Sequence, residues 1–357
     1  MLDLAALFDQ VTKRHASDLH LRVGLKPRLR VHGELVEAQD SPAATDSDLE
    51  SLLTQSLHDY HRVRFEAEGE VDVACQGALG TRYRANFFRD ARGIAASFRR
   101  IQERVQSIAE LGIPGEVEEL AKVRRGLVLI TGATGSGKSS TLAALIDWIN
   151  RNETRHIVTL EDPVEFVHQP MKSLIRQRNL GEDVLDFASG VRDALRGDVD
   201  VLLVGELRDV ETTRAALSAS ETGMLVFGTL HTNDAAQTID RLIDVFPAAE
   251  QDQVRAVVAE ALAAVLSQTL LTRADNRGRV AATELMVTTP AIQALIREGR
   301  THDIPNFLQS GRDKGMWRMN DSINRLMKDG TITQGEQRAS MRGTPVLDTR
   351  RPQPSAT

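Results

Sequence analysis

A short apolar run, a glycine-rich segment and a helical pattern follow one another directly within residues 127–149. Residues 127–130 are Leu-Val-Leu-Ile, and residues 132–139 read Gly-Ala-Thr-Gly-Ser-Gly-Lys-Ser. The second segment fits the pattern G-x-x-x-x-G-K-[ST], and the apolar residues after it recur at helical spacing. A continuous apolar strand is typical of a parallel sheet covered on both faces. The chain is therefore predicted to contain an α/β domain built around this loop.

The chemistry of this loop indicates a nucleotide site. Glycines allow backbone N–H groups to converge on phosphate oxygens, and the helix N-terminus adds partial positive charge. Lys138 is predicted to reach the β- and γ-phosphates, and Ser139 to bind Mg²⁺ with phosphates and waters. The cofactors predicted are ATP and Mg²⁺. The predicted nucleotide-binding residues are Gly132, Ala133, Thr134, Gly135, Ser136, Gly137, Lys138, Ser139 and Ser140.

Polar residues follow three more apolar runs, at 157–160, 201–204 and 225–227. In parallel sheets the ligand lies beyond the carboxyl ends of the strands. Glu206 is predicted to orient and deprotonate the attacking water. The magnesium-binding aspartate usual after such a strand is replaced by Gly205.

The other two strand ends leave alternatives open. Glu161 is a candidate to assist with Mg²⁺, or to orient an arginine or a metal-bound water, and the alternative is a capping or salt-bridging role. His231 is a candidate to sense the γ-phosphate, and stabilising the sheet end is nearly as good an interpretation.

The pattern before residue 103 predicts a separate α+β domain with an antiparallel sheet, covering residues 1–102. A short helix, alternating strands and one helix at about 46–68 precede strands at 70–76, 81–89 and 94–101. Residues 103–122 are predicted to be a linker, residues 123–345 the ATPase domain, and residues 346–357 a disordered tail.

The second half of the ATPase domain is predicted to be mostly helical, from about residue 248. Its apolar stretch at 257–271 is interrupted by Glu260, Ser267 and Gln268. We interpret it as a buried helix and not as a membrane span. The single cysteine, Cys75, and the absence of a signal-peptide pattern favour a cytoplasmic protein.

Seven arginines lie between residues 81 and 104, opposed only by Asp90 and Glu103. They are Arg82, Arg84, Arg89, Arg92, Arg99, Arg100 and Arg104. Arg82 and Arg84 lie two apart on a predicted strand and share a face. Such a face can supply arginine fingers to a triphosphate in trans, and the alternative is a solvated face or a site for an acidic partner.

Single-stranded nucleic acid is a third interpretation of this segment, because Tyr83, Phe87, Phe88 and Phe98 lie among the arginines. The net charge of −6 and the core-like alternation of the aromatics count against it. We expect no nucleic-acid partner.

Taken together, these motifs resemble those of the PilT-like retraction ATPases of type IV pili, within the secretion ATPases. The resemblance extends from residue 16 to about residue 330. Besides the Walker A loop it includes an Asp box at 159–166, an atypical Walker B segment at 203–209 and a His box at 228–232. Residues 291–298, Ala-Ile-Gln-Ala-Leu-Ile-Arg-Glu, are similar to a segment that the family uses in retraction.

The resemblance implies a RecA-like P-loop ATPase core with a smaller N-terminal α+β domain of PAS-like type. It implies a homohexameric ring in which Arg82, Arg84 and Arg99 approach nucleotide. The implied partners are an inner-membrane pilus platform protein and a paralogous motor ATPase, with no direct membrane insertion. The implied location is the cytoplasmic face of the inner membrane.

The sequence departs from the family at several positions. Met224 stands where a histidine is usual, Ala133 where a proline is frequent, and Gln293 and Ala294 where Arg and Asn occur. A retraction motor is the leading hypothesis. The alternatives are a pilus-extension or type II secretion ATPase and an accessory paralogue of low activity that supports a sister motor. The short N-terminal region and the single cysteine count against the extension class, and intact Lys138 and Glu206 count against the accessory scaffold.

Overall fold

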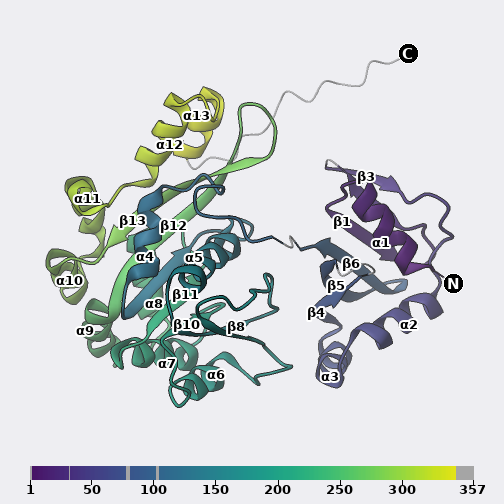
Figure 1. Cartoon of the computed structure of the whole chain (residues 1–357), viewed down its shortest axis with the longest axis horizontal. Helices are drawn as coiled ribbons and strands as arrows, with labels where there is room; N and C mark the ends of the chain where they lie inside the picture. Colours follow the sequence, from purple (N-terminus) through teal and green to yellow (C-terminus); the bar gives the residue numbers. More distant parts are fainter. Residues whose placement is uncertain (1, 32, 78–80, 102–103, 343–357) are drawn as a thin grey trace. The chain divides into compact units, whose positions relative to one another are not determined.

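The computed structural model describes residues 2–31, 33–77, 81–101 and 104–342, and Figure 1 shows its helices and strands. The chain divides into two compact units. One comprises residues 1–105, 146–206 and 211–226, and the other comprises residues 106–145, 207–210 and 227–357. The predicted boundaries at residues 102 and 122 stay a prediction. The predicted tail at 346–357 lies outside the described residues.

The N-terminal segment forms a six-stranded sheet of order β3-β2-β1-β6-β5-β4, in which every neighbouring pair is antiparallel. The strands are β1 (Asp18–Arg22), β2 (Arg28–Val31), β3 (Glu34–Glu37), β4 (Glu70–Gln76), β5 (Arg82–Asp90) and β6 (Gly93–Arg100), and the helices are α1 (Leu4–Lys13), α2 (Asp46–Ser56) and α3 (Asp59–Glu68). The predicted α+β class is confirmed. Strand β3 was not predicted.

The core of this sheet follows the period of two in its strands. On β5, Tyr83, Ala85 and Phe87 are fully buried, while Arg82 and Arg84 lie on the opposite face and are half-buried. Phe8 of α1 stacks on Tyr83 with ring centroids 4.3 Å apart. One face of the sheet is therefore closed by α1 and aromatic side chains, and the other presents the arginines.

The single helix predicted at 46–68 is wrong, because the chain is extended between α2 and α3. Leu57 and His58 have extended backbones, and Leu57 is buried. The guanidinium group of Arg62 donates hydrogen bonds to the carbonyls of Thr54 (2.5 Å) and Leu57 (3.1 Å). These carbonyls lie at the end of α2, where helical partners are missing, so a side chain from the next helix stabilises a break that no Gly or Pro marks.

Cys75 on β4 is half-buried, and burial raises the pKa of its thiol to about 12. Because only the thiolate reacts with iodoacetamide, we expect alkylation at pH 8 to be at least about a hundredfold slower in the folded protein than in the urea-unfolded chain. Mass spectrometry of timed samples measures both rates, with N-acetylcysteine as the reference thiol. Equal rates in the two states would contradict this burial.

The second sheet has seven strands in the order β13-β12-β7-β11-β10-β8-β9. The pairs β12–β7, β10–β8 and β8–β9 are parallel, and β12–β13 is antiparallel. The strands are β7 (Gly126–Thr131), β8 (His156–Glu161), β9 (Leu174–Asn179), β10 (Val201–Val204), β11 (Leu225–Leu230), β12 (Leu262–Thr272) and β13 (Arg279–Val287). The four predicted apolar strands are β7, β8, β10 and β11.

Helices lie in most of the connections between these strands, although β9 follows β8 and β13 follows β12 without one. The helices are α4 (Glu119–Lys122), α5 (Lys138–Asn152), α6 (Phe187–Ala194), α7 (Val210–Glu221), α8 (Ala235–Asp244) and α9 (Gln251–Ala261). Within the predicted linker, a 3₁₀ turn at Gly115–Glu118 leads into α4. The predicted α/β class is confirmed.

The predicted buried helix at 257–271 is wrong, because β12 begins at Leu262, directly after α9. Strand β12 lies between β7 and β13 in the sheet, and most of its side chains are buried. A strand buried on both faces shows no period of two, so its pattern is hard to distinguish from that of a buried helix. Strand β9 was also not predicted, and the region after residue 248 is less helical than expected.

The last helices of the described chain are α10 (Pro290–Arg297), α11 (Ile304–Ser310), α12 (Met319–Lys328) and α13 (Gln334–Arg342). Helix α10 begins after Thr289, whose hydroxyl accepts a hydrogen bond from the Ile292 N–H (3.4 Å). Ile292, Leu295 and Ile296 are buried. The apolar face of this helix is therefore part of the core.

None of the helices in the described ranges is long and apolar enough to cross a membrane.

Candidate nucleotide-binding site

The glycine-rich loop joins the buried strand β7 to the N-terminus of α5. Its three glycines, Gly132, Gly135 and Gly137, have φ of 145°, 77° and 93°. L side chains rarely adopt these conformations, so the loop depends on glycine. A Cβ at Gly132 would lie 2.2 Å from the Gln268 carbonyl oxygen, whereas Gly135 faces open space. The loop is therefore held tightly at its first glycine and is open at its tip.

Two polar groups of the loop fit a phosphate ligand. The Ser136 hydroxyl oxygen is buried and has no hydrogen-bond partner among the described residues. The Lys138 ammonium group donates to the carbonyls of Gly132 (2.7 Å) and Ala133 (3.2 Å). Ser139 is exposed in the first turn of α5, where a hydroxyl can reach a metal ion. An orphaned hydroxyl, a folded-back ammonium and an open tip suit a triphosphate with its magnesium ion.

Glu161 is the last residue of β8 and is half-buried. Its Oε1 accepts hydrogen bonds from the Thr159 hydroxyl (2.7 Å) and the Gln177 amide (3.3 Å). Burial raises the pKa of the Glu161 carboxyl, although these hydrogen bonds act in the opposite direction. The side chain is therefore oriented by β8 and β9, and its carboxyl holds a proton more readily than an exposed glutamate does.

Glu206 follows β10 after Gly205, and both residues are half-buried. The Gly205 N–H donates to the Leu160 carbonyl (2.8 Å), so this peptide is bonded to β8. A Cβ at Gly205 would lie 3.1 Å from that same carbonyl oxygen. A side chain at this position would therefore be in tight contact with β8.

His231 directly follows β11 and is exposed. Two backbone hydrogen bonds hold the end of β11. The Thr229 carbonyl accepts one from the Leu207 N–H (3.1 Å), and the Leu230 carbonyl accepts the other from the Gly132 N–H (3.3 Å). The second bond joins the His box to the start of the glycine-rich loop. Met224, where the family usually has a histidine, is buried.

The arginines of the N-terminal sheet have partners within their own unit. Arg82 donates to the carbonyls of Val164 (2.8 Å) and Glu165 (3.1 Å) in the Asp box. Arg84 forms ion pairs with Asp72 (3.0 Å) and Glu165 (3.7 Å). The predicted shared face is confirmed for these two residues.

Arg99 has a different partner from Arg82 and Arg84. It is exposed on β6 and bonds the buried carboxylate of Asp18 (2.9 Å). The Arg99 guanidinium and the Ser17 hydroxyl hold the pKa of the Asp18 carboxyl below its usual range, against the effect of burial.

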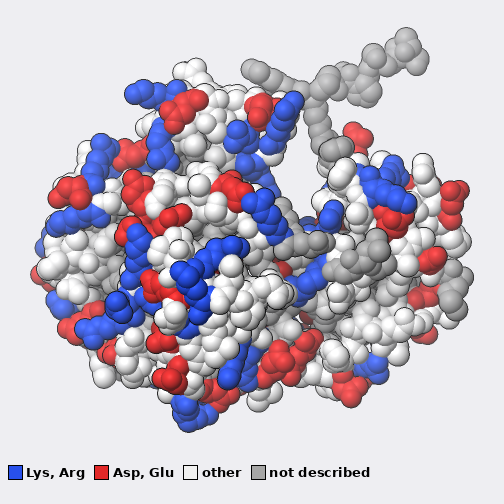
Figure 2. Space-filling view, in the orientation of Figure 1, with Lys and Arg blue, Asp and Glu red and all other residues white. Residues whose placement is uncertain are grey.

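Three of the four aromatic residues behind the nucleic-acid interpretation are buried, and Phe88 is half-buried. Tyr83, Phe87 and Phe98 are buried in the core of the N-terminal sheet and cannot stack on bases. Acidic and basic side chains are interspersed on the face shown in Figure 2.

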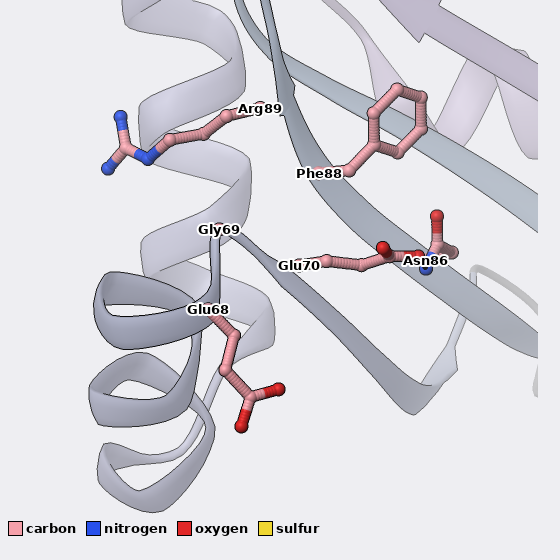
Figure 3. A pocket seen from close by; sticks show the side chains of 6 residues that line it. All are labelled: Glu68, Gly69, Glu70, Asn86, Phe88 and Arg89. Carbon is pink, nitrogen blue, oxygen red and sulfur yellow. Dashed lines mark hydrogen bonds between the residues drawn. The ribbon is translucent and has the colours of Figure 1, made fainter.

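A surface pocket lies where α3 passes into β4 (Figure 3). It is lined by Glu68, Gly69, Glu70, Asn86, Phe88 and Arg89. The Asn86 amide donates to Glu70 Oε1 (2.9 Å) across its floor. None of the predicted nucleotide or catalytic residues lines this pocket, and we assign it no role in the chemistry. Across the described ranges, no group of three His, Cys, Asp or Glu side chains could hold a metal ion.

The loop geometry and the α/β core define a P-loop nucleotide-binding protein, and comparison with known proteins gives its family. Residues 2–337 match the model of the family described as Type II/IV secretion system protein. The chain is 46% identical over 306 residues to a "Twitching motility protein" of Neisseria gonorrhoeae, which covers 86% of this chain and 82% of the relative. It is 44% identical over 337 residues to the "Type IV pilus retractation ATPase PilT" of Pseudomonas aeruginosa, covering 94% of this chain and 97% of the relative.

A solved structure agrees with these relatives. It is described as the pilus retraction motor PilT with bound ADP, and it superposes with a TM-score of 0.86 at 40% identity, covering 97% of this chain and 98% of that chain. The chain belongs to the type II/IV secretion ATPase family. Within it, the chain is a member of the PilT-type retraction group, as its motifs predicted.

Gln268 of β12 is a residue that sequence reasoning missed as part of this site. It was noted only as a polar interruption of a predicted helix. No pattern in the sequence around Gln268 predicts its contact with the loop, because that contact depends on the pairing of β12 with β7.

Proposed function

We propose that this chain is a hexameric motor that couples ATP hydrolysis to the retraction of type IV pili. The observation that carries the proposal is the glycine-rich loop with its positive-φ glycines, in a chain that aligns over nearly its whole length with retraction ATPases. Bound Mg²⁺ would neutralise phosphate charge during transfer. Ser139 would ligate it, and Lys138 would leave the loop carbonyls to contact the β- and γ-phosphates.

Glu206 would act as the general base of the reaction. It follows β10, which is two strands from β7 in the sheet. Its carboxylate would orient a water in line with the γ-phosphate and accept its proton. Glu161 would hold a metal-bound water or an arginine at the neighbouring strand end, and His231 would contact the γ-phosphate side.

Arg82, Arg84 and Arg99 would complete the site from a neighbouring subunit of a homohexameric ring. Two of them contact the Asp box in the chain described here, and an exchange of these contacts for phosphate would couple nucleotide state to domain movement. In this proposal the arginines belong to an N-terminal domain at 1–102, and the glycine-rich loop belongs to an ATPase domain at 123–345. A linker at 103–122 joins the two.

The proposed partners are an inner-membrane pilus platform protein and a paralogous motor ATPase. The proposed location is the cytoplasmic face of the inner membrane, without insertion of the chain. Direct nucleic-acid binding is not part of the proposal.

A deletion strain tests the physiological role. We expect cells lacking the chain to carry more surface pili and to lose twitching motility, because assembled pili are no longer withdrawn. Complementation with the wild-type gene should restore both, whereas Lys138→Ala should restore neither. Pilus number is counted by electron microscopy, and motility is measured from the diameter of the subsurface twitching zone.

Cells without pili after deletion would contradict the retraction role and favour the extension alternative. Normal twitching with wild-type pilus number would favour an accessory role. A catalytically dead complement that restores motility would favour the scaffold.

A further inference from the structure

The side chain of Gln268 spans the space between the glycine-rich loop and helix α5. Its Nε2 donates to the Ser136 carbonyl (2.7 Å), and its Oε1 accepts from the Thr141 hydroxyl (2.8 Å). The three residues are at most 5% exposed. The orientation of the amide is determined by its partners, because a carbonyl can only accept and must therefore face the NH₂ group.

Gln268 also lies close to the first and the last glycine of the loop. A Cβ at Gly137 would lie 2.6 Å from Gln268 Nε2, and a Cβ at Gly132 would lie 2.2 Å from the Gln268 carbonyl oxygen. Gln268 therefore contacts the loop at its first and last glycine, once through its backbone and once through its side chain. At Gly132 the backbone oxygen leaves no room for a side chain, and at Gly137 a side chain would displace the Gln268 amide.

The hydrogen bond to the Ser136 carbonyl has a consequence for the opposite side of the same peptide. In a trans peptide the C=O of residue 136 and the N–H of residue 137 point in opposite directions. Holding the carbonyl toward β12 directs the Gly137 N–H away from β12. In loops of this kind the N–H groups that point away from the sheet bind the phosphates.

We propose that Gln268 is a positioning residue that holds the glycine-rich loop in its phosphate-binding shape from the neighbouring strand. The inference rests on the proposed nucleotide-binding function and adds to it a residue outside the loop motif. Gln268 contacts no reacting atom. It acts by holding one peptide plane, so its loss should weaken nucleotide binding more than it slows the chemical step.

The neighbouring residue Ser267 offers a matched control. It is equally buried on β12, and its hydroxyl pairs with that of Thr131 (2.9 Å), on the strand that precedes the loop. Ser267→Ala removes a buried hydrogen bond of the same kind without removing a contact to a loop peptide. A general loss of core polarity would affect both variants alike.

The test measures ADP binding by calorimetry and ATP hydrolysis at steady state in the full chain. Gln268→Met keeps the length of the side chain and removes both hydrogen bonds. We expect it to raise the Kd for ADP and the KM for ATP by at least about tenfold with kcat within about threefold, and Ser267→Ala to change each by less than about twofold. Thr141→Val leaves the bond to Ser136 in place and should raise Kd by about threefold.

The inference is overturned if Gln268→Met lowers the unfolding temperature as Ser267→Ala does but leaves Kd and KM unchanged. If Gln268→Met does not fold, Thr141→Val decides, and an unchanged Kd in that variant overturns the inference. A wild-type protein that binds ADP but does not hydrolyse ATP would contradict the proposed function, while the comparison of Kd values would still test Gln268.

Discussion

Glu206→Gln is expected to lower kcat for ATP hydrolysis by about 10²- to 10³-fold while the Kd for ATP stays within about threefold. The substitution keeps the size of the side chain but removes its ability to accept a proton from water. Glu206 follows a fully buried strand and is half-buried, so its position is determined by the sheet. Binding should persist because the loop between β7 and α5 supplies the phosphate contacts.

The measurement is steady-state phosphate release, with ATP binding followed by calorimetry in the same preparations. Glu211→Gln is the matched control, since Glu211 is an exposed glutamate in the first turn of α7, five residues further along the chain. We expect its kcat to stay within about twofold of wild type. A Glu206→Gln protein that hydrolyses ATP at the wild-type rate would remove Glu206 from the proposed mechanism.

Gly132→Ala is expected to weaken nucleotide binding by roughly a hundredfold or more and to lower the unfolding temperature of the protein. Gly132 has φ of 145°, and an added Cβ would lie 2.2 Å from a backbone oxygen of β12. Backbone strain and steric overlap together cost about 2–6 kcal/mol. A backbone oxygen in a paired strand cannot move aside as a flexible side chain would, so the loop must shift.

Two other glycines provide a graded series for this prediction. Gly135→Ala, in the same loop, has a φ of 77° but open space around it, so it tests backbone strain alone. Gly115→Ala has open space and no such φ, and we expect it to be neutral. Differential scanning calorimetry and ADP titration measure all three. Equal behaviour of the variants at 132 and 115 would contradict the tight packing of the loop against β12.

The strands that were predicted correctly and those that were missed differ in how much of their signal is local. Strands β7 and β10 are short apolar runs bounded by polar or glycine residues, and β5 alternates visibly between buried and exposed positions. In β12 most side chains are buried, including five consecutive ones at 264–268, so no period of two appears in its sequence. The break between α2 and α3 was missed for another reason: no Gly or Pro marks it, and the side chain that stabilises it, Arg62, lies a few residues later in α3.

The phosphate loop could be predicted from the sequence, because its glycines, lysine and serine lie within eight consecutive residues and their spacing is the signal. The alternation of Arg82 and Arg84 against a buried aromatic face could also be predicted. Tertiary structure alone decided that residues 262–272 form a strand and that Gln268 meets Ser136, which is 132 residues earlier in the chain. Gln268 reaches the loop because β12 pairs with β7 in one register, and neither segment alone determines that register.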